Sequence, residues 1–255
     1  MSFASIMKEV NKTERTISPP GGEKIIDREK WQLAGQSFIT QTIQDLWGPP
    51  GEKPFEYLLK RGIKQSTIAD WKLGFSSIEG WGDAQEWGLL PEDKIWIPAG
   101  ITIPNFEGDV LHGIKIRKRE GEPRYVLLKG SEIWLYGSDT FKDSAILYLF
   151  EGEFDCLLAW QTEYKLSYGA LPAGQNIKRE YQELFKPIED VIVCYDNDER
   201  GIQAAEKLCQ LPHFWNSVSL PHGKDLTEYA QSGGDVLEWL MQQTDHLGRC
   251  LHGTR

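Results

Sequence analysis

Apolar residues recur at helical spacing in the first third of the chain. Residues 31–47 show this spacing, which predicts a helix that Gly48-Pro49-Pro50-Gly51 ends. Its apolar positions are Leu33, Phe38, Ile39, Ile43 and Leu46. Two shorter helices are predicted over residues 54–63 and 67–73, since each pattern closes at a glycine. The preceding residues 1–30 are polar and rich in turn formers, and are expected to form a loose arm.

The pattern changes to short β-rich runs between residues 94 and 128. Isoleucine, valine and aromatic residues alternate there with polar ones, and Glu107-Gly108 and Gly121-Glu122 mark turns. The runs cover residues 95–97, 101–103, 110–116 and 125–128. This segment is therefore predicted to be an antiparallel sheet.

From residue 145 onward, apolar runs alternate with helical stretches. The expected strand and helix pairs are 145–150 with 153–161, 166–168 with 178–185, 191–195 with 202–208, and 217–220 with 226–230. Four such units in a row predict an α/β fold with a parallel sheet flanked by helices. Parallel sheets of this kind bind ligands at the carboxyl ends of their strands.

Composition places the chain among ordinary globular proteins. Of its 255 residues, 40% are hydrophobic and 26% charged, and no apolar run is long enough to span a membrane. The four cysteines show neither zinc-ligand spacing nor a disulfide framework. The N-terminus lacks the apolar core of a signal peptide, so a cytoplasmic location is expected. The net charge of −10 argues against a nucleic-acid partner unless basic residues are gathered in one place.

Acidic residues follow three of the four predicted strands. Glu151 and Asp155 come after the first strand, Asp196 and Asp198 after the third, and Asp225 after the fourth. Carboxylates that converge at one sheet edge need a cation, and oxygen ligands favour Mg²⁺, or Mn²⁺ in its place. Each motif alone is more typical of a solvated turn, but their succession at strand ends indicates a metal site.

These motifs resemble the TOPRIM pattern, in which E-G-x-x-D follows one strand and D-x-D-x-x-G another, before a further acidic position. The likeness covers residues 145–240, and the stretch 195–206 looks especially like primases and phage-type primase-helicases. Upstream, residues 57–63 and 73–75 are similar to the helical part of the DnaG-type catalytic core. The resemblance thus implies a Rossmann-like TOPRIM domain preceded by a mixed α+β primase-like subdomain.

The resemblance also implies roles and partners. Glu151 would be a general base or metal organiser, Asp196 and Asp198 would be catalytic metal ligands with Asp225, and Asp155 would support them. The implied activity is primer synthesis on single-stranded DNA from NTPs or dNTPs, with a replicative helicase as a further partner. The implied domains are an arm (1–30), the primase-like subdomain (31–142), the TOPRIM domain (143–243) and a tail (244–255). Host replication, a mobile element and defence all remain open.

A departure from the family pattern keeps two alternatives open. The last motif is usually D-x-D, but Thr227 stands where its second carboxylate is expected, with Glu228 as a substitute. The chain also shows neither a zinc module before the core nor a helicase after it, so priming is expected to need help. A TOPRIM nuclease, or an accessory protein that binds nucleic acid without turnover, is the alternative.

Basic residues gather in one segment of this acidic chain. Residues 112–129 hold six basic and two acidic residues, a local charge of +4. Next to a metal site this favours phosphate contact over a solvated hairpin. The candidate nucleic-acid or nucleotide contacts are Lys115, Arg117, Arg119, Arg124, Lys129 and, beside the last acidic motif, Lys224. For Trp81, Trp87 and Trp96, a core or partner-surface role is favoured over base stacking.

Overall fold

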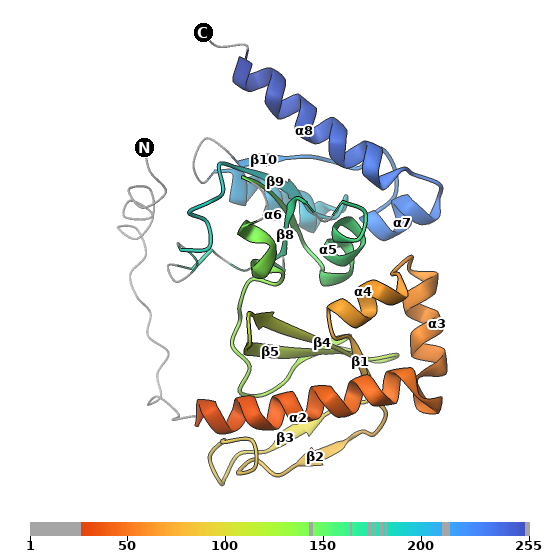
Figure 1. Ribbon diagram of the computed structural model, residues 1–255, viewed down its shortest axis with the longest axis vertical. Helices are drawn as coiled ribbons and strands as arrows, with labels where there is room; N and C mark the ends of the chain where they lie inside the picture. The colour runs from red at the N-terminus through yellow and green to blue at the C-terminus, as the bar shows by residue number, and fades with distance from the viewer. Residues whose placement is uncertain are drawn as a thin grey trace. The chain divides into compact units, whose positions relative to one another are not determined.

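The computed structural model describes residues 27–142, 145–163, 165–172, 175, 177, 178, 181, 183–210 and 215–252, without the side chains of 142 and 246–252. The described residues form two compact units, one that ends at Trp134 and one that begins at Leu135 (Figure 1). In these ranges, no helix combines the length and apolar character needed to cross a membrane.

The first unit begins with the helices predicted from the apolar spacing. Helix α2 (Arg28–Trp47) begins where the Asp27 carboxylate accepts a hydrogen bond from the Lys30 N–H at 3.1 Å, and it ends at Gly48. After a 3₁₀ turn, η1 (Pro49–Gly51), come α3 (Glu52–Lys60) and α4 (Gln65–Asp70). The buried side of α2 packs along the sheet of this unit.

The sheet of the first unit is antiparallel, as predicted, in the order β1-β4-β5-β6. Its strands are β1 (Gly74–Ser76), β4 (Gly100–Glu107), β5 (Val110–Arg117) and β6 (Tyr125–Leu127). A separate ribbon pairs β2 (Gly80–Gly82) with β3 (Ile95–Ile97). The sequence did not predict β1 and β2, because three residues beside glycines show no alternation. Trp31, Trp87, Ile95 and Ile116 share the core.

The second unit has the predicted parallel sheet, in the order β10-β9-β7-β8. Its elements are η2 (Ser138–Lys142), β7 (Ile146–Phe150), α5 (Glu153–Trp160), β8 (Ser167–Ala170), β9 (Asp190–Cys194), α6 (Glu199–Cys209), β10 (Trp215–Ser217) and α7 (Leu226–Gln231). The central strands β7 and β9 are almost continuously apolar and buried, as expected where both faces of a sheet are covered.

Two features of this unit differ from the expectation. Within the stretch 178–185, predicted as a helix, Tyr181 lies in a 3₁₀ turn and residues 183–185 lie in turns, while residues 179, 180 and 182 fall outside the described ranges. Helix α8 (Val236–His252) was not predicted at all. It is anchored to the sheet because the Tyr148 hydroxyl donates to the Leu240 carbonyl at 2.6 Å, and Trp239 is buried beside it.

Candidate active site at the carboxyl edge of the parallel sheet

The two central strands bring the first and second acidic motifs together. Strands β7 and β9 pair in parallel with Phe150 opposite Cys194, so Glu151 and Asp196 both leave the sheet at the same edge. The Glu151 carboxylate accepts a hydrogen bond from the Asp196 backbone N–H. The sequence spacing alone predicted this convergence, since parallel strands end on one side.

Two of the predicted metal ligands also act as helix caps. Asp198 accepts the Gly201 N–H at 2.8 Å at the start of α6, and Asp225 accepts the Glu228 N–H at 2.7 Å at the start of α7. Each carboxylate therefore keeps its second oxygen for another partner. Gly201 is required here because a Cβ at this position would lie 2.2 Å from the Asp196 carbonyl oxygen.

Asn197 joins the second acidic loop to the third, a role that sequence reasoning missed. Its backbone N–H donates to the Lys224 carbonyl at 2.7 Å. Its side-chain amide donates to the carbonyls of Leu220 and Gly223, both at 3.1 Å. The middle residue of the D-x-D motif thus fixes the loop that carries Asp225. An amide between two aspartates was the available signal, because it can donate where a carboxylate cannot.

Asp155 is held by the residue that departs from the family pattern. The Thr227 backbone N–H and hydroxyl both donate to Asp155 Oδ1, at 3.1 and 3.0 Å. Both side chains are buried, with exposed fractions of 4% for Thr227 and 7% for Asp155. A hydroxyl here satisfies a buried carboxylate that a second aspartate would repel.

The acidic edge carries negative charge that its surroundings do not fully neutralise. Among the described residues, Glu151 Oε2 is buried and has no hydrogen-bond partner. Burial raises the pKa of Glu151, and the negative charge of Asp198 adds to this while Arg200 opposes it. Burial and the charges of Glu151 and Asp225 raise the pKa of Asp196 to about 6.

Lys224 supplies a positive charge at this edge. Its Nζ lies 3.1 Å from Asp198 Oδ2 and 3.8 Å from Asp196 Oδ2. The hydrogen bond to Asp198 raises the pKa of Lys224, while the pKa of Asp198 is lowered by the Gly201 N–H and by Lys224. The ammonium therefore lies beside the D-x-D pair that the sequence assigned to a metal ion.

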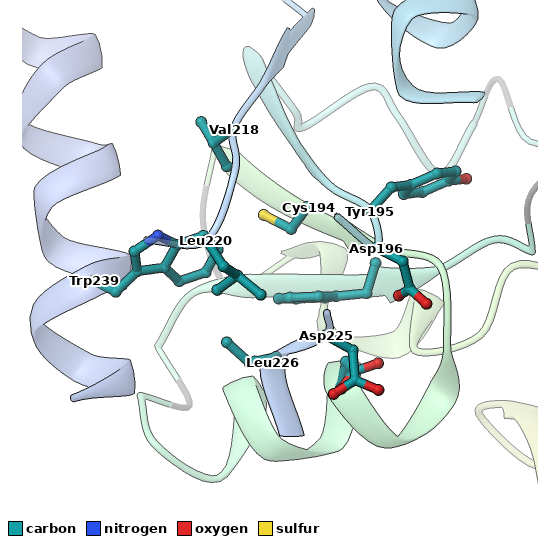
Figure 2. Close-up of a pocket in the computed structure, with 10 residues that line it drawn as sticks. Cys194, Tyr195, Asp196, Val218, Leu220, Asp225, Leu226 and Trp239 are labelled. Carbon is teal, nitrogen blue, oxygen red and sulfur yellow. The ribbon is translucent and has the colours of Figure 1, made fainter. Parts of the chain in front are cut away.

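The carboxylates share an edge without forming a closed cage. A cavity of ≈ 10 Å³ lies between them, lined by Asp155, Asp196 and Asp225 among other residues. Figure 2 shows the carboxylates of Asp196 and Asp225 on the same side of this cavity, away from Trp239 of α8. Within the described ranges, no three His, Cys, Asp or Glu side chains are grouped closely enough to hold a metal ion.

The predicted basic contacts of the first unit surround a separate groove. A cavity of ≈ 810 Å³ is lined by α3, the start of β4 and the end of β5. Its charged residues are Lys53, Lys60, Arg117, Arg119 and Arg124 against Glu52 and Glu56. The Arg117 guanidinium carbon lies 4.6 Å from the Tyr57 ring centroid, so an aromatic face and a cation adjoin in the groove.

The other predicted basic residues lie in different surroundings. Lys115 Nζ lies 5.9 Å from the ring centroid of Tyr125 on the neighbouring strand. Lys129 Nζ lies 2.5 Å from Asp93 Oδ1, and the Asp93 side chain is only 8% exposed. A phosphate could engage Lys129 only by competing with that ion pair. Arg117, Arg119 and Arg124 are therefore the predicted contacts that the structure brings together.

Comparison with known proteins identifies the second unit. A Toprim-like family model matches residues 148–230, which run from β7 to α7 and include every acidic motif described above. This part of the chain is therefore similar to Toprim-like domains. The resemblance to TOPRIM primases of the DnaG type extends beyond it, because the matches to curated relatives cover most of the chain.

Several curated proteins that are similar to this chain are DNA primases. It is 27% identical over 255 residues to the DNA primase of Escherichia coli K12, covering 84% of this chain and 43% of that protein. It is 26% identical over 227 residues to the Enterococcus faecalis DNA primase, covering 72% and 36%. The chain thus spans less than half the length of these relatives.

Solved structures show which fold surrounds the Toprim-like domain. A DnaG primase catalytic domain bound to single-stranded DNA matches with a TM-score of 0.67 and 21% identity, over 85% of this chain and 81% of that one. The DnaG catalytic core matches with a TM-score of 0.66 and 22% identity, over 84% and 79%. The chain has this fold, as the sequence predicted.

Proposed function

We propose that this chain is a primase catalytic core that joins nucleotides into short primers on single-stranded DNA by metal-dependent phosphoryl transfer. The observation that carries the proposal is the buried, unpartnered Oε2 of Glu151 next to Asp196 at the edge of a Toprim-like domain. Such an oxygen is costly unless a cation or a proton joins it. The relatives named DNA primase support the same activity.

The donor set at this edge fits a divalent cation of the Mg²⁺ type. Glu151, Asp196, Asp198 and Asp225 provide only carboxylate oxygens, which hard cations prefer. No three of these carboxylates are grouped closely enough to hold an ion as they stand among the described residues, so the four side chains would have to draw together around it, with Asp155 fixed behind them by Thr227. When bound, the ion would lower the pKa of the attacking hydroxyl and offset the charge that develops on the phosphoryl oxygens.

Three residues of the site would accept the proton, contact the nucleotide and position the third acidic loop. Glu151 accepts the proton of the primer hydroxyl, because its buried Oε2 has no hydrogen-bond partner among the described residues and lies next to Asp196. Lys224 leaves Asp198 and contacts the triphosphate, since its side chain is 52% exposed and flexible. Asn197 keeps the Asp225 loop in place through its bonds to Leu220 and Gly223.

Template binding is assigned to the basic groove of the first unit. Arg117, Arg119 and Arg124 would contact phosphates, and Tyr57 and Phe75 offer apolar faces in the same cavity. Single-stranded nucleic acids are bound by this combination of positive charge and aromatic surface. A helicase partner, and the choice between ribonucleotides and deoxyribonucleotides, belong to the proposal only as implications of the family.

A binding protein without turnover is the second candidate. The observation that favours it is the Thr227–Asp155 pair, which leaves the edge with one carboxylate fewer than the family's D-x-D pattern. Template binding would then persist with either Mg²⁺ or Mn²⁺, but no product would form.

An extension assay separates these functions. A labelled single strand is incubated with NTPs or dNTPs and Mg²⁺, with and without a helicase, using the wild type, Asp196→Ala and the control Asp109→Ala. Asp109 lies in the exposed turn between β4 and β5. We expect extension products from the wild type and the control, and none from Asp196→Ala. Shortened strands would indicate a nuclease. Unchanged strands with intact binding would indicate the non-catalytic alternative.

A further inference from the structure

The β2–β3 ribbon presents two tryptophans side by side on its outer face. The strands are antiparallel, with Trp81 directly opposite Trp96. The inner face carries Ile95, which is fully buried, and Ile97, which packs against the core. Directly opposed residues project from the same face of a ribbon, so both indoles lie on the side away from the core. Trp81 is 68% exposed.

Each of these indoles has a lysine ammonium near its ring. Lys94 Nζ lies 5.9 Å from the ring centroid of Trp81, and Lys118 Nζ lies 5.7 Å from that of Trp96. In the part of the chain that the structure describes, neither lysine forms an ion pair with a carboxylate. The surface therefore carries two indoles, Trp81 exposed and Trp96 half-buried, each with a lysine beside it that forms no ion pair among the described residues.

This arrangement calls for a ligand that supplies both flat apolar faces and negative charge. An exposed tryptophan forgoes the burial that normally stabilises so large a side chain. Trp87, by contrast, is buried in the core of the same unit, as expected for a structural tryptophan. Single-stranded nucleic acid has bases that stack on aromatic rings and phosphates that attract lysines.

We propose that the ribbon, through Trp81, Trp96, Lys94 and Lys118, is a stacking platform that extends the single-strand binding surface beyond the basic groove. The inference rests on the proposed template binding by that groove. The two surfaces are continuous in the chain, because Lys118 directly follows Arg117 and its N–H donates to the Arg124 carbonyl at 2.9 Å. Both arginines line the groove, so a strand passing Lys118 reaches Trp96 next.

The test measures the affinity of the full chain for fluorescein-labelled oligothymidylates by anisotropy. Strands of about 4 and about 16 nucleotides are compared, which bracket the length held by typical single-strand sites. We expect Trp81→Ala to raise the Kd of the long strand roughly 5- to 100-fold, as for loss of one stacked base. The Kd of the short strand should change less than twofold.

Matched variants show whether stacking is responsible. Leu33 is 69% exposed on α2, so Leu33→Ala removes a similarly exposed apolar side chain from the same unit. We expect it to bind like the wild type. The double variant Lys94→Gln/Lys118→Gln should weaken long-strand binding without altering the core, and Lys30→Gln is its control. A long strand with abasic sites keeps its phosphates, and it should bind wild type and Trp81→Ala alike.

The outcomes distinguish this inference from the proposed function. If the wild type binds neither strand, template binding fails and the platform fails with it. If the wild type binds and Trp81→Ala binds the long strand equally well, the groove stands and the platform is refuted. Loss of self-association in Trp81→Ala, measured by sedimentation with unchanged strand binding, would instead identify the ribbon as an interface between two copies and overturn the proposal.

Discussion

Replacing Thr227 by aspartate should make the stability of this protein depend on a divalent cation. The substitution restores the D-x-D pattern and places a second carboxylate where the Thr227 hydroxyl now donates to Asp155 Oδ1 at 3.0 Å. Both positions are buried, so water screens the pair only weakly. In the absence of metal, we therefore expect Thr227→Asp to unfold more easily than the wild type.

The magnitude follows from charge and hydrogen bonding. Two carboxylates about 4 Å apart at an effective dielectric constant near 20 repel each other by about 4 kcal/mol. Loss of the hydroxyl donor to a charged acceptor costs about 1.5–3 kcal/mol more. Thr227→Val keeps the shape and loses only the donor, so it should show the second cost alone. One of the two carboxylates in Thr227→Asp can bind a proton, which makes its deficit smaller at low pH.

Urea denaturation of both variants, in EDTA and in excess Mg²⁺, measures these differences. We expect Mg²⁺ to recover most of the deficit of Thr227→Asp, because binding to the folded state alone adds to its unfolding free energy. Thr227→Val should gain no more from Mg²⁺ than the wild type does. Equal deficits in the two variants, with no selective recovery, would show that position 227 is only a packing position and would refute this account of the site.

Two further predictions concern the second acidic loop. The pKa of Asp196 is about 6 in the folded protein, against 3.8 for an ordinary aspartate, so folding favours the protonated carboxyl. Its contribution to the free energy of unfolding is therefore fully present below pH 4 and is lost as the pH rises through 6. In EDTA at pH 7, Asp196→Asn should therefore be up to about 3 kcal/mol more stable than the wild type. This difference should vanish near pH 4. Urea melts over a pH series measure it, and a difference that stays constant with pH would contradict the prediction. Asn197→Ala loses two hydrogen bonds to loop carbonyls, so we expect it to lower kcat for extension with little change in template Kd. The control Asn216→Ala, at an exposed position of β10, should change neither kcat nor Kd.

The parallel sheet and its acidic edge were predictable because they follow from local rules. Continuous apolar runs indicated the buried strands β7 and β9, and the topology of a parallel sheet then placed Glu151 and Asp196 at one edge. Helix α8 was missed although its buried residues Val236, Trp239 and Leu240 recur at helical spacing. The local signal for this helix was present in the sequence and was not used.

The hydrogen bonds and ion pairs of the site could not be predicted, because the spacing of residues does not specify the partner of each side chain. Asn197, between two aspartates, was given no role from the sequence, yet its amide connects two loops. Lys224 was assigned to nucleotide contact from its position, but its ammonium forms an ion pair with Asp198. Thr227 was recognised as a missing carboxylate, whereas its hydroxyl satisfies a buried one. In each case the residue type was visible and the partner was not.

The ion pair between Lys224 and Asp198 suits an exchange of charges under the proposed function. A nucleotide arrives as a triphosphate with its own divalent cation. If the carboxylates of Asp196 and Asp198 were to bind the cation, the ammonium of Lys224 would be released beside the phosphates. The carboxylates would then exchange the ammonium for the metal ion, and the ammonium would exchange the carboxylates for the phosphates. Neither the acidic edge nor the ammonium is then left without a partner of opposite charge. Metal and nucleotide are then expected to bind more tightly together than either does alone.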